Sequence, residues 1–308
     1  MAAPVAGASS SKGPATMRWE SRLDRDHPLV GRIWDVKAAR FVDDATVIDR
    51  VRQARFVGVG EQHDNADHHR LEAWLLSVAS VGRRPAVVFE MIEVEEQAAV
   101  DVALEKHPGE PDAIAVAVDW AHSGWPAWDL YRPVFDVAVR RGLPIRGGGL
   151  GRELAHRVAH EGTAALAPAL VHRFALDAPL DPETARVLRD EMRDAHCGML
   201  PESMLDAMAL IQRARDAELA EQTAEAAQGA VLIAGNGHVR ADRGVPRALS
   251  RGTDATLLAI ALLEVRREWQ DPAAYASAFA ANTLPFDYVL FTPRASDEDH
   301  CAALRPRR

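Results

Sequence analysis

Two short motifs place a histidine three residues after a glycine, and each motif follows a compact apolar run: Gly60-Glu61-Gln62-His63 and Gly235-Asn236-Gly237-His238. A further glutamate, Glu90, closes another apolar run. Two imidazoles and two carboxylates are suitable ligands for a divalent metal such as Zn, Mn, Fe or Co. They equally suit a metal-free acid–base set, in which a carboxylate orients a histidine that activates water. We therefore expect one catalytic or metal-binding site made by Glu61, His63, Glu90 and His238.

Each of these motifs also has a purely structural interpretation. Glu61 could cap a helix, and His238 could be a loop histidine whose hydrogen bonds are satisfied locally. In that case the polar residues serve folding alone, and the protein is a catalytically silent scaffold. The occurrence of the same spacing twice, both times after an apolar run, favours a functional site.

The first motif continues into a polar stretch, His63-Asp64-Asn65-Ala66-Asp67-His68-His69. We expect Asp67 to cap a helix that begins at His68, with His69 as an ordinary polar residue of this segment. His68 and Asp64 are candidates for orienting His63 from behind, as partners of metal ligands often do.

The elements that position these residues can be read from the apolar runs. Strands are expected over 55–60, 85–90, 143–147, 230–235, 256–263 and 287–292, and helices over 68–81, 91–105, 127–141, 182–197 and 202–228. Strands that are apolar throughout and separated by helices indicate an α/β fold with a mainly parallel sheet flanked by helices. The long helical stretch predicts a smaller all-helical cap subdomain.

Ligands of open parallel sheets bind beyond the carboxyl ends of the strands, where all the motifs fall. Arg152, which follows the third strand, joins the same rim. Gln212, Arg215 and Asp216 of the expected cap have helical spacing and either face the rim or form an exposed polar surface. Trp120, Trp125 and Trp128 suggest one wall of an apolar pocket.

Composition and net charge limit the classes of function that the chain can have. The chain has 308 residues, of which 48% are hydrophobic, and a formal net charge of −9. An acidic chain is a poor nucleic-acid binder, and no run of about 18 apolar residues is present to span a membrane. We expect a disordered leader over 1–20, one α/β domain over 21–297 with a helical insertion at about 160–228, and a tail over 298–308. No secretory signal is readable, which points to the cytoplasm. One bridge between Cys197 and Cys301 is an alternative, but we expect two free thiols.

Several segments together resemble the ChaN-like haem-binding proteins, which are grouped with the Tiki and TraB proteins and, more distantly, with the erythromycin esterases. The resemblance spans about residues 27–293, and its clearest segments are GEQHDNADHHRLEAWLL from Gly60, FEM from Phe89, WDLYRP from Trp128 and AGNGHVRADRGVP from Ala234. It implies an α/β sheet domain with a small helical domain.

The resemblance also implies ligands and partners. Haem or a divalent metal ion would be the cofactor, and a homodimer and a cell-envelope location would follow from the family. Haem ligation in the family is thought to use a tyrosine at a dimer surface, which makes Tyr131 the first candidate of the three tyrosines, with Arg152 and Gln212 as further cofactor-binding residues. The Tiki and esterase likeness implies instead a hydrolase, metal-dependent or of the His/Glu acid–base type, that uses Glu61, His63, Glu90 and His238.

Overall fold

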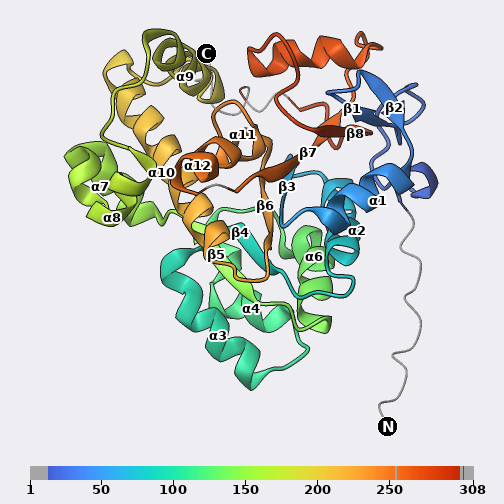
Figure 1. Cartoon of the computed structure of the whole chain (residues 1–308), viewed down its shortest axis with the longest axis horizontal. Helices are drawn as coiled ribbons and strands as arrows, with labels where there is room; N and C mark the ends of the chain where they lie inside the picture. The colour runs from blue at the N-terminus through green and yellow to red at the C-terminus, as the bar shows by residue number, and fades with distance from the viewer. Residues whose placement is uncertain (1–12, 254, 299–300, 302–308) are drawn as a thin grey trace.

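The computed structural model describes residues 13–253, 255–298 and 301, and these form an α/β fold around a single eight-stranded sheet (Figure 1). The strand order is β2-β1-β8-β7-β3-β6-β4-β5. Six neighbouring strands are parallel: β3 (Phe56–Glu61), β4 (Ala86–Glu93), β5 (Ile145–Gly149), β6 (Ala230–Gly235), β7 (Leu257–Glu264) and β8 (Tyr288–Thr292). The predicted fold class and all six predicted strands are confirmed.

Two short strands at one edge were not expected from the sequence. Strand β1 (Ile33–Asp35) pairs antiparallel with β8 and with β2 (Arg40–Val42). Each has three residues, too few for an alternating pattern to stand out. They extend the sheet on the side away from the polar motifs.

The parallel strands are apolar throughout because the sheet is covered on both faces. In β3, Val57 and Val59 belong to one buried cluster and Phe56 to the other. In β4, Phe89 and Val88 divide in the same way. Successive side chains of a strand point to opposite faces, so a run without polar residues is what a central strand requires.

Helices cover both faces. The cluster that contains Val57 includes residues of α1 (Asp44–Gln53), α2 (Ala66–Ala79), α3 (Gln97–Lys106), α4 (Asp112–Ala117), α5 (Trp120–Ser123) and α6 (Trp128–Arg140). The cluster that contains Phe56, on the opposite face, includes residues of α7 (Arg152–Glu161), α8 (Pro168–Phe174), α10 (Leu205–Ala224), α12 (Val245–Gly252) and the 3-10 helix η5 (Pro272–Phe279). The short helix α11 (Asn236–Val239) follows β6, and α9 (Pro182–Ala195) packs on α10 at the outside of the molecule (Figure 1). Further 3-10 turns are η1 (Pro14–Thr16), η2 (Val94–Glu96), η3 (Gly162–Ala165) and η4 (Glu202–Met204).

Two helix boundaries differ from expectation. The helix expected from His68 begins at Ala66, and its N-cap is Asn65, whose side chain accepts from the backbone N–H groups of Asp67 and His68. Asp67 instead accepts the N–H groups of Glu20 and Ser21. The helix expected over 91–105 starts at Gln97, because β4 continues to Glu93 and a 3-10 turn follows it.

Glycines in β3 let α11 lie directly on the strand. A Cβ atom at Gly60 would lie 2.6 Å from Oδ1 and 3.1 Å from Cα of Asn236. At Gly58 it would meet Leu257 at 2.6 Å and Val239 at 3.0 Å. Any larger residue would push α11, and with it His238, away from the sheet.

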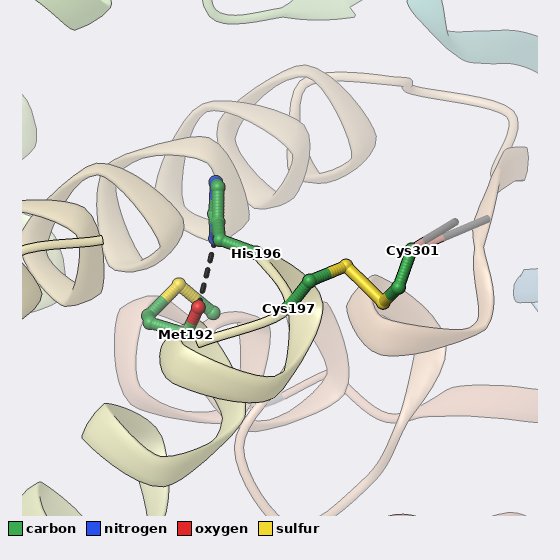
Figure 2. The surroundings of a disulfide bond; sticks show 4 residues. All are labelled: Met192, His196, Cys197 and Cys301. Atoms are coloured by element: carbon green, nitrogen blue, oxygen red, sulfur yellow. Dashed lines mark hydrogen bonds between the residues drawn. A yellow bond between two sulfur atoms is a disulfide. The ribbon is translucent and has the colours of Figure 1, made fainter. Parts of the chain in front are cut away.

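A disulfide joins Cys197, between α9 and α10, to Cys301, which follows β8 (Figure 2). The Cα atoms are 5.6 Å apart across 104 residues of sequence. The prediction of two free thiols was wrong. The neighbouring imidazole of His196 is tied to the carbonyl oxygen of Met192 at 2.8 Å, which holds the end of α9 beside the bridge (Figure 2).

The predicted leader and tail are described only in part. Residues 1–12 of the leader and 299–300 and 302–308 of the tail lie outside the described residues. Among the described residues of these two segments, Gly13 is buried and the side chain of Cys301 is bonded to Cys197. No helix in the described part of the chain combines the length and apolarity that crossing a bilayer requires.

Candidate functional site

Glu61 and His63 stand at the carboxyl end of β3. The Nδ1 atom of His63 lies 2.8 Å from Oε1 of Glu61. The hydroxyl of Tyr131, from α6, donates to the same oxygen at 3.2 Å and lies 3.3 Å from Nδ1 of His63. The Glu61 side chain is fully buried, whereas the His63 side chain is 35% exposed. His63 therefore presents its outer edge to solvent and its inner edge to a carboxylate.

Behind this pair, α2 supplies His69 and Glu72. The Nδ1 atom of His69 lies 3.1 Å from Oε2 of Glu72 and 3.2 Å from Oε2 of Glu61. Its Nε2 donates to the carbonyl oxygen of His63 at 3.1 Å, and its ring lies over that of Tyr131, with centroids 4.0 Å apart. One ligand atom each from Glu61, His69 and Glu72 fits within a 4.8 Å span, which is the tightest such grouping among the described residues.

This buried group has an unusual charge balance. Burial would lower the pKa of His69, but the charges of Glu72 and Glu61 raise it to about 9. Burial, together with the charge of Glu61, raises the pKa of Glu72 to about 7. Oε1 of Glu72 and Oε2 of Glu61 are buried without a hydrogen bond. Two buried carboxylates thus face one imidazole, and part of their hydrogen-bonding capacity is unused.

A second imidazole–carboxylate group stands on the neighbouring strands. The Nε2 atom of His238 lies 3.2 Å from Oε1 of Glu90, and its Nδ1 lies 2.7 Å from Oδ1 of Asp216 on α10. The other oxygen of Glu90 accepts the N–H of Gly235 at 2.8 Å. The amide of Gln212 lies 3.2 Å from the His238 ring. His238 is therefore held on both sides and is nearly fully buried.

The charges of this second group are strongly coupled. Burial would lower the pKa of His238, but Glu90 and Asp216 raise it to about 10. Burial would raise the pKa of Glu90, yet the charge of His238 holds it well below its usual range. Burial raises the pKa of Asp216 to about 6. At neutral pH the geometry fits an imidazolium that donates to two acids.

The two groups meet at Gly235, which pairs with Glu61 in the register of β3 and β6. A Cβ atom at Gly235 would lie 3.1 Å from Nε2 of His63, so this imidazole rests against bare backbone. Burial would lower the pKa of His63, but the Glu61 hydrogen bond and the charge of Glu90 raise it. Both G-x-x-H motifs and both glutamates thus end at one edge of the sheet.

Beside this edge lies a cavity of about 310 Å³. Glu90, Trp125, Arg152 and Arg215 line it. The Trp125 ring stands edge-on to the His63 ring, with centroids 4.9 Å apart. Nη2 of Arg152 donates to the carbonyl oxygen of Ser123, whereas Arg215 has no hydrogen bond or ion pair with any described residue. The cavity therefore offers an aromatic wall and two guanidinium groups, and His63 lies against the Trp125 ring that forms this wall.

Other predicted residues are distributed differently. Gln212 and Asp216 face His238, and Arg215 faces the cavity, so the cap helix points toward the rim and is not a solvated polar face. His68 does not touch His63. Its ring accepts the N–H of Gln62 and bonds to Thr292.

The predicted roles of two neighbouring histidines are thus exchanged, because His69 rather than His68 supports His63. Glu72 was missed altogether. The signal for it is the i,i+3 spacing of His69 and Glu72 in the first half of α2.

All three tyrosines of the chain are buried: Tyr131, Tyr275 and Tyr288. The Tyr131 hydroxyl donates a hydrogen bond to Glu61, and the Tyr131 ring packs edge-on against that of Trp120. Burial raises the pKa of Tyr131 above its ordinary value, as does the charge of Glu61. The structure places Tyr131 under the site and not on a surface that a second chain could reach.

Comparison with known proteins supplies a family. Residues 47–249 match the family model described as haem-binding uptake, Tiki superfamily, ChaN. Among solved structures, ChaN of Campylobacter jejuni, in a structure described as showing cofacial haem binding, superposes with a TM-score of 0.63 at 19% identity, covering 84% of this chain and 95% of that one. The erythromycin esterase EreC in its open conformation gives a TM-score of 0.44 at 12% identity, covering 92% of this chain and 99% of that one. No curated protein matches the chain.

Proposed function

Because this chain belongs to the ChaN family of haem-binding uptake proteins in the Tiki superfamily, we propose that it binds haem, with His63 as the iron ligand. The observation that carries this proposal is the state of the His63 ring. Its Nδ1 is occupied by Glu61, and its Nε2 has no hydrogen-bond partner among the described residues. Histidines that bind metals through one nitrogen commonly donate the other to a carboxylate, which fixes the tautomer and raises ligand basicity.

A tyrosine ligand does not fit this chain, since none of its three tyrosines is exposed. His63 fits better because it is part-exposed and opens beside the rim cavity lined by Trp125 and Arg215. An aromatic ring suits the face of a porphyrin. Arg152 and Arg215 are suited to its carboxylates, since a guanidinium can form paired hydrogen bonds with a carboxylate. Bound haem would be cargo, held through one reversible iron–nitrogen bond.

The experiment is a titration of the purified protein with haemin, followed by its visible absorption. We expect a saturable Soret shift that His63→Ala abolishes. The matched control is His107→Ala, which removes an exposed imidazole that pairs with Glu110 and does not line the cavity. An unchanged Soret shift in His63→Ala would show that His63 is not the iron ligand.

Two related expectations follow from the family. Cofacial haem binding, as described for the Campylobacter jejuni protein, needs two haems face to face, so we propose that two chains associate when haem is bound. Sedimentation of the protein with and without haemin tests this. A disulfide persists in oxidising compartments, so we also propose an extracytoplasmic location, testable by fractionation of the source cells.

A second candidate ligand is a divalent cation at Glu61, His69 and Glu72. Such a cation would either add an iron-binding site beside the haem site or stabilise the fold. The oxygens Oε2 of Glu61 and Oε1 of Glu72 favour it, because both are buried without a hydrogen bond and a cation would use their lone pairs. One imidazole nitrogen and two carboxylates suit Zn, Mn, Fe or Co. Titration with Co²⁺ should give visible ligand-field bands that Glu72→Gln removes and Glu153→Gln, on the exposed side of α7, leaves intact.

A further inference from the structure

A second and larger cavity, of about 590 Å³, is lined by residues of α8, α9, α10 and α12, and we call it the cap cavity. It is separate from the rim cavity, and the two approach each other at His238. Glu90, which contacts one side of that ring, lines the rim cavity. Gln212 and Asp216, which contact its other edge, line the cap cavity.

Part of the lining of the cap cavity is apolar. Phe174 and Leu176 from the α8 region, Leu188 and Met192 from α9, and Ala217 from α10 contribute to it. Phe174, Leu176, Leu188 and Ala217 are at most 5% exposed. Pockets with such linings bury the apolar body of a small molecule and use a few polar groups to orient it.

The lining also carries a small excess of positive charge, because its arginines outnumber its acids, which are Asp181, Glu191, Asp216 and Asp242. Five arginines line the cavity: Arg213, Arg240, Arg243, Arg247 and Arg251. Two of them are neutralised, because Glu191 and Asp242 pair with both Arg240 and Arg243.

The remaining three arginines form no salt bridge with a described acid, although the charge of Asp177 acts on Arg213. Arg247 and Arg251 lie one turn apart on α12, and no hydrogen bond or ion pair joins the guanidinium group of either to a described residue. Arg213 donates only to the carbonyl oxygens of Ala175 and Ala178. Burial lowers the pKa of Arg213, and the nearby charge of Arg251 lowers it further. Like charges collected in an acidic protein, with its net charge of −9, repel one another unless an anion joins them.

We propose that the cap cavity binds a small apolar anion, a carboxylate or phosphate ester whose apolar body lies against Leu176, Leu188 and Met192. Its anionic group lies among the guanidinium groups of Arg213, Arg247 and Arg251. Such a ligand covers the apolar wall, relieves the repulsion among the cations, and lies beside Gln212 and Asp216, which hold His238. The inference goes beyond haem binding and rests on a different cavity, so neither depends on the other.

The test uses haem-free full-length protein and isothermal titration calorimetry with three probes that share one chain length: dodecanoate, dodecyl phosphate and dodecyltrimethylammonium. We expect both anions to bind saturably, and the cation to bind at least tenfold more weakly. The tighter of the two anions identifies the headgroup. Failure of both anions to bind, or equal binding of the cation, would overturn the proposal.

Variants locate the site. The double variant Arg247→Gln/Arg251→Gln should weaken anion binding at least tenfold, because each exposed arginine loses a charge-assisted hydrogen bond to the ligand and no partner within the fold. The control, Arg52→Gln/Arg157→Gln, makes the same charge change on α1 and α7 and should bind as the parent does. Equal affinity of all three proteins would place the anion elsewhere and refute the assignment. His63→Ala, which tests haem binding, should leave dodecanoate affinity unchanged.

Discussion

The Nδ1 atom of His63 lies 2.8 Å from Oε1 of Glu61, two residues earlier in the chain. The carboxylate is buried beneath the sheet edge and the imidazole is part-exposed above it. One strand end therefore carries both the exposed ring and the group that fixes its orientation. This arrangement leaves Nε2 of His63 without a hydrogen-bond partner among the described residues, and Nε2 is the atom that we propose as the iron ligand.

Replacing Glu61 with glutamine tests this dependence. Glu61→Gln keeps the shape of the side chain but removes the charge that raises the basicity of His63, so haemin should bind about 10- to 100-fold more weakly. Absorption titration of the variant against the parent measures the change. Glu153→Gln is the matched control, and equal affinities of all three proteins would show that Glu61 does not support His63.

Tyr131→Phe separates the two modes of iron ligation. The Tyr131 hydroxyl donates to Glu61 at 3.2 Å in a fully buried position, so its loss should lower the free energy of unfolding by about 1 kcal/mol. The Soret spectrum of the haem complex should not change, because the ring lies under His63 and does not face the cavity. Urea denaturation and absorption spectroscopy give the two readouts. Loss of the haem spectrum in Tyr131→Phe would favour the tyrosine.

Much of the fold could be predicted because parallel strands are buried on both faces. Apolar runs such as the one ending at Gly60 carry that signal without ambiguity. The strands β1 and β2 carried none, since three residues cannot show a period. The end of β4 was misjudged because Met91 and Ile92 continue the strand with residues that also suit a helix.

The site was predictable only where glycine marks a turn. The two G-x-x-H motifs led to His63 and His238, and strand topology led to Glu90. His69 and Glu72 were not recognised, because a buried polar pair on a helix has the same sequence pattern as a solvated face. The disulfide could not be derived either, since its formation depends on two Cα atoms lying 5.6 Å apart across 104 residues.

The stability of the fold should fall with rising pH through the titration of His238. Its pKa is raised to about 10 in the folded state, from about 6.5 in the unfolded chain. A raised pKa stabilises fully below the unfolded value, and the stabilisation is lost between about pH 6.5 and 10, by roughly 1.4 kcal/mol per pH unit at most. His69, with a pKa of about 9, acts in the same direction.

The measurement is the free energy of unfolding from urea titrations at several values between pH 6 and 10, for the parent and for His238→Gln. The difference between the two proteins should shrink as the pH rises, because only the parent has an imidazolium to lose. His122→Gln, at an exposed position, is the control. Parallel curves for parent and His238→Gln would contradict the ion triad of Glu90, His238 and Asp216.

The disulfide should stabilise the protein by closing a long loop of the unfolded chain. Cys197 and Cys301 enclose the whole segment from the start of α10 to the end of the sheet. For a separation of 104 residues, the loss of unfolded-state entropy corresponds to about 3–5 kcal/mol. A reducing agent should lower the free energy of unfolding of the parent by that amount, and should have no effect on Cys197→Ser/Cys301→Ser, which already lacks the bridge. Because Cys197 follows α9, which forms one wall of the cap cavity, reduction should also weaken dodecanoate binding. A parent whose thiols are shown to be free, yet whose stability equals that of the oxidised protein, would show that the bridge adds nothing to the fold.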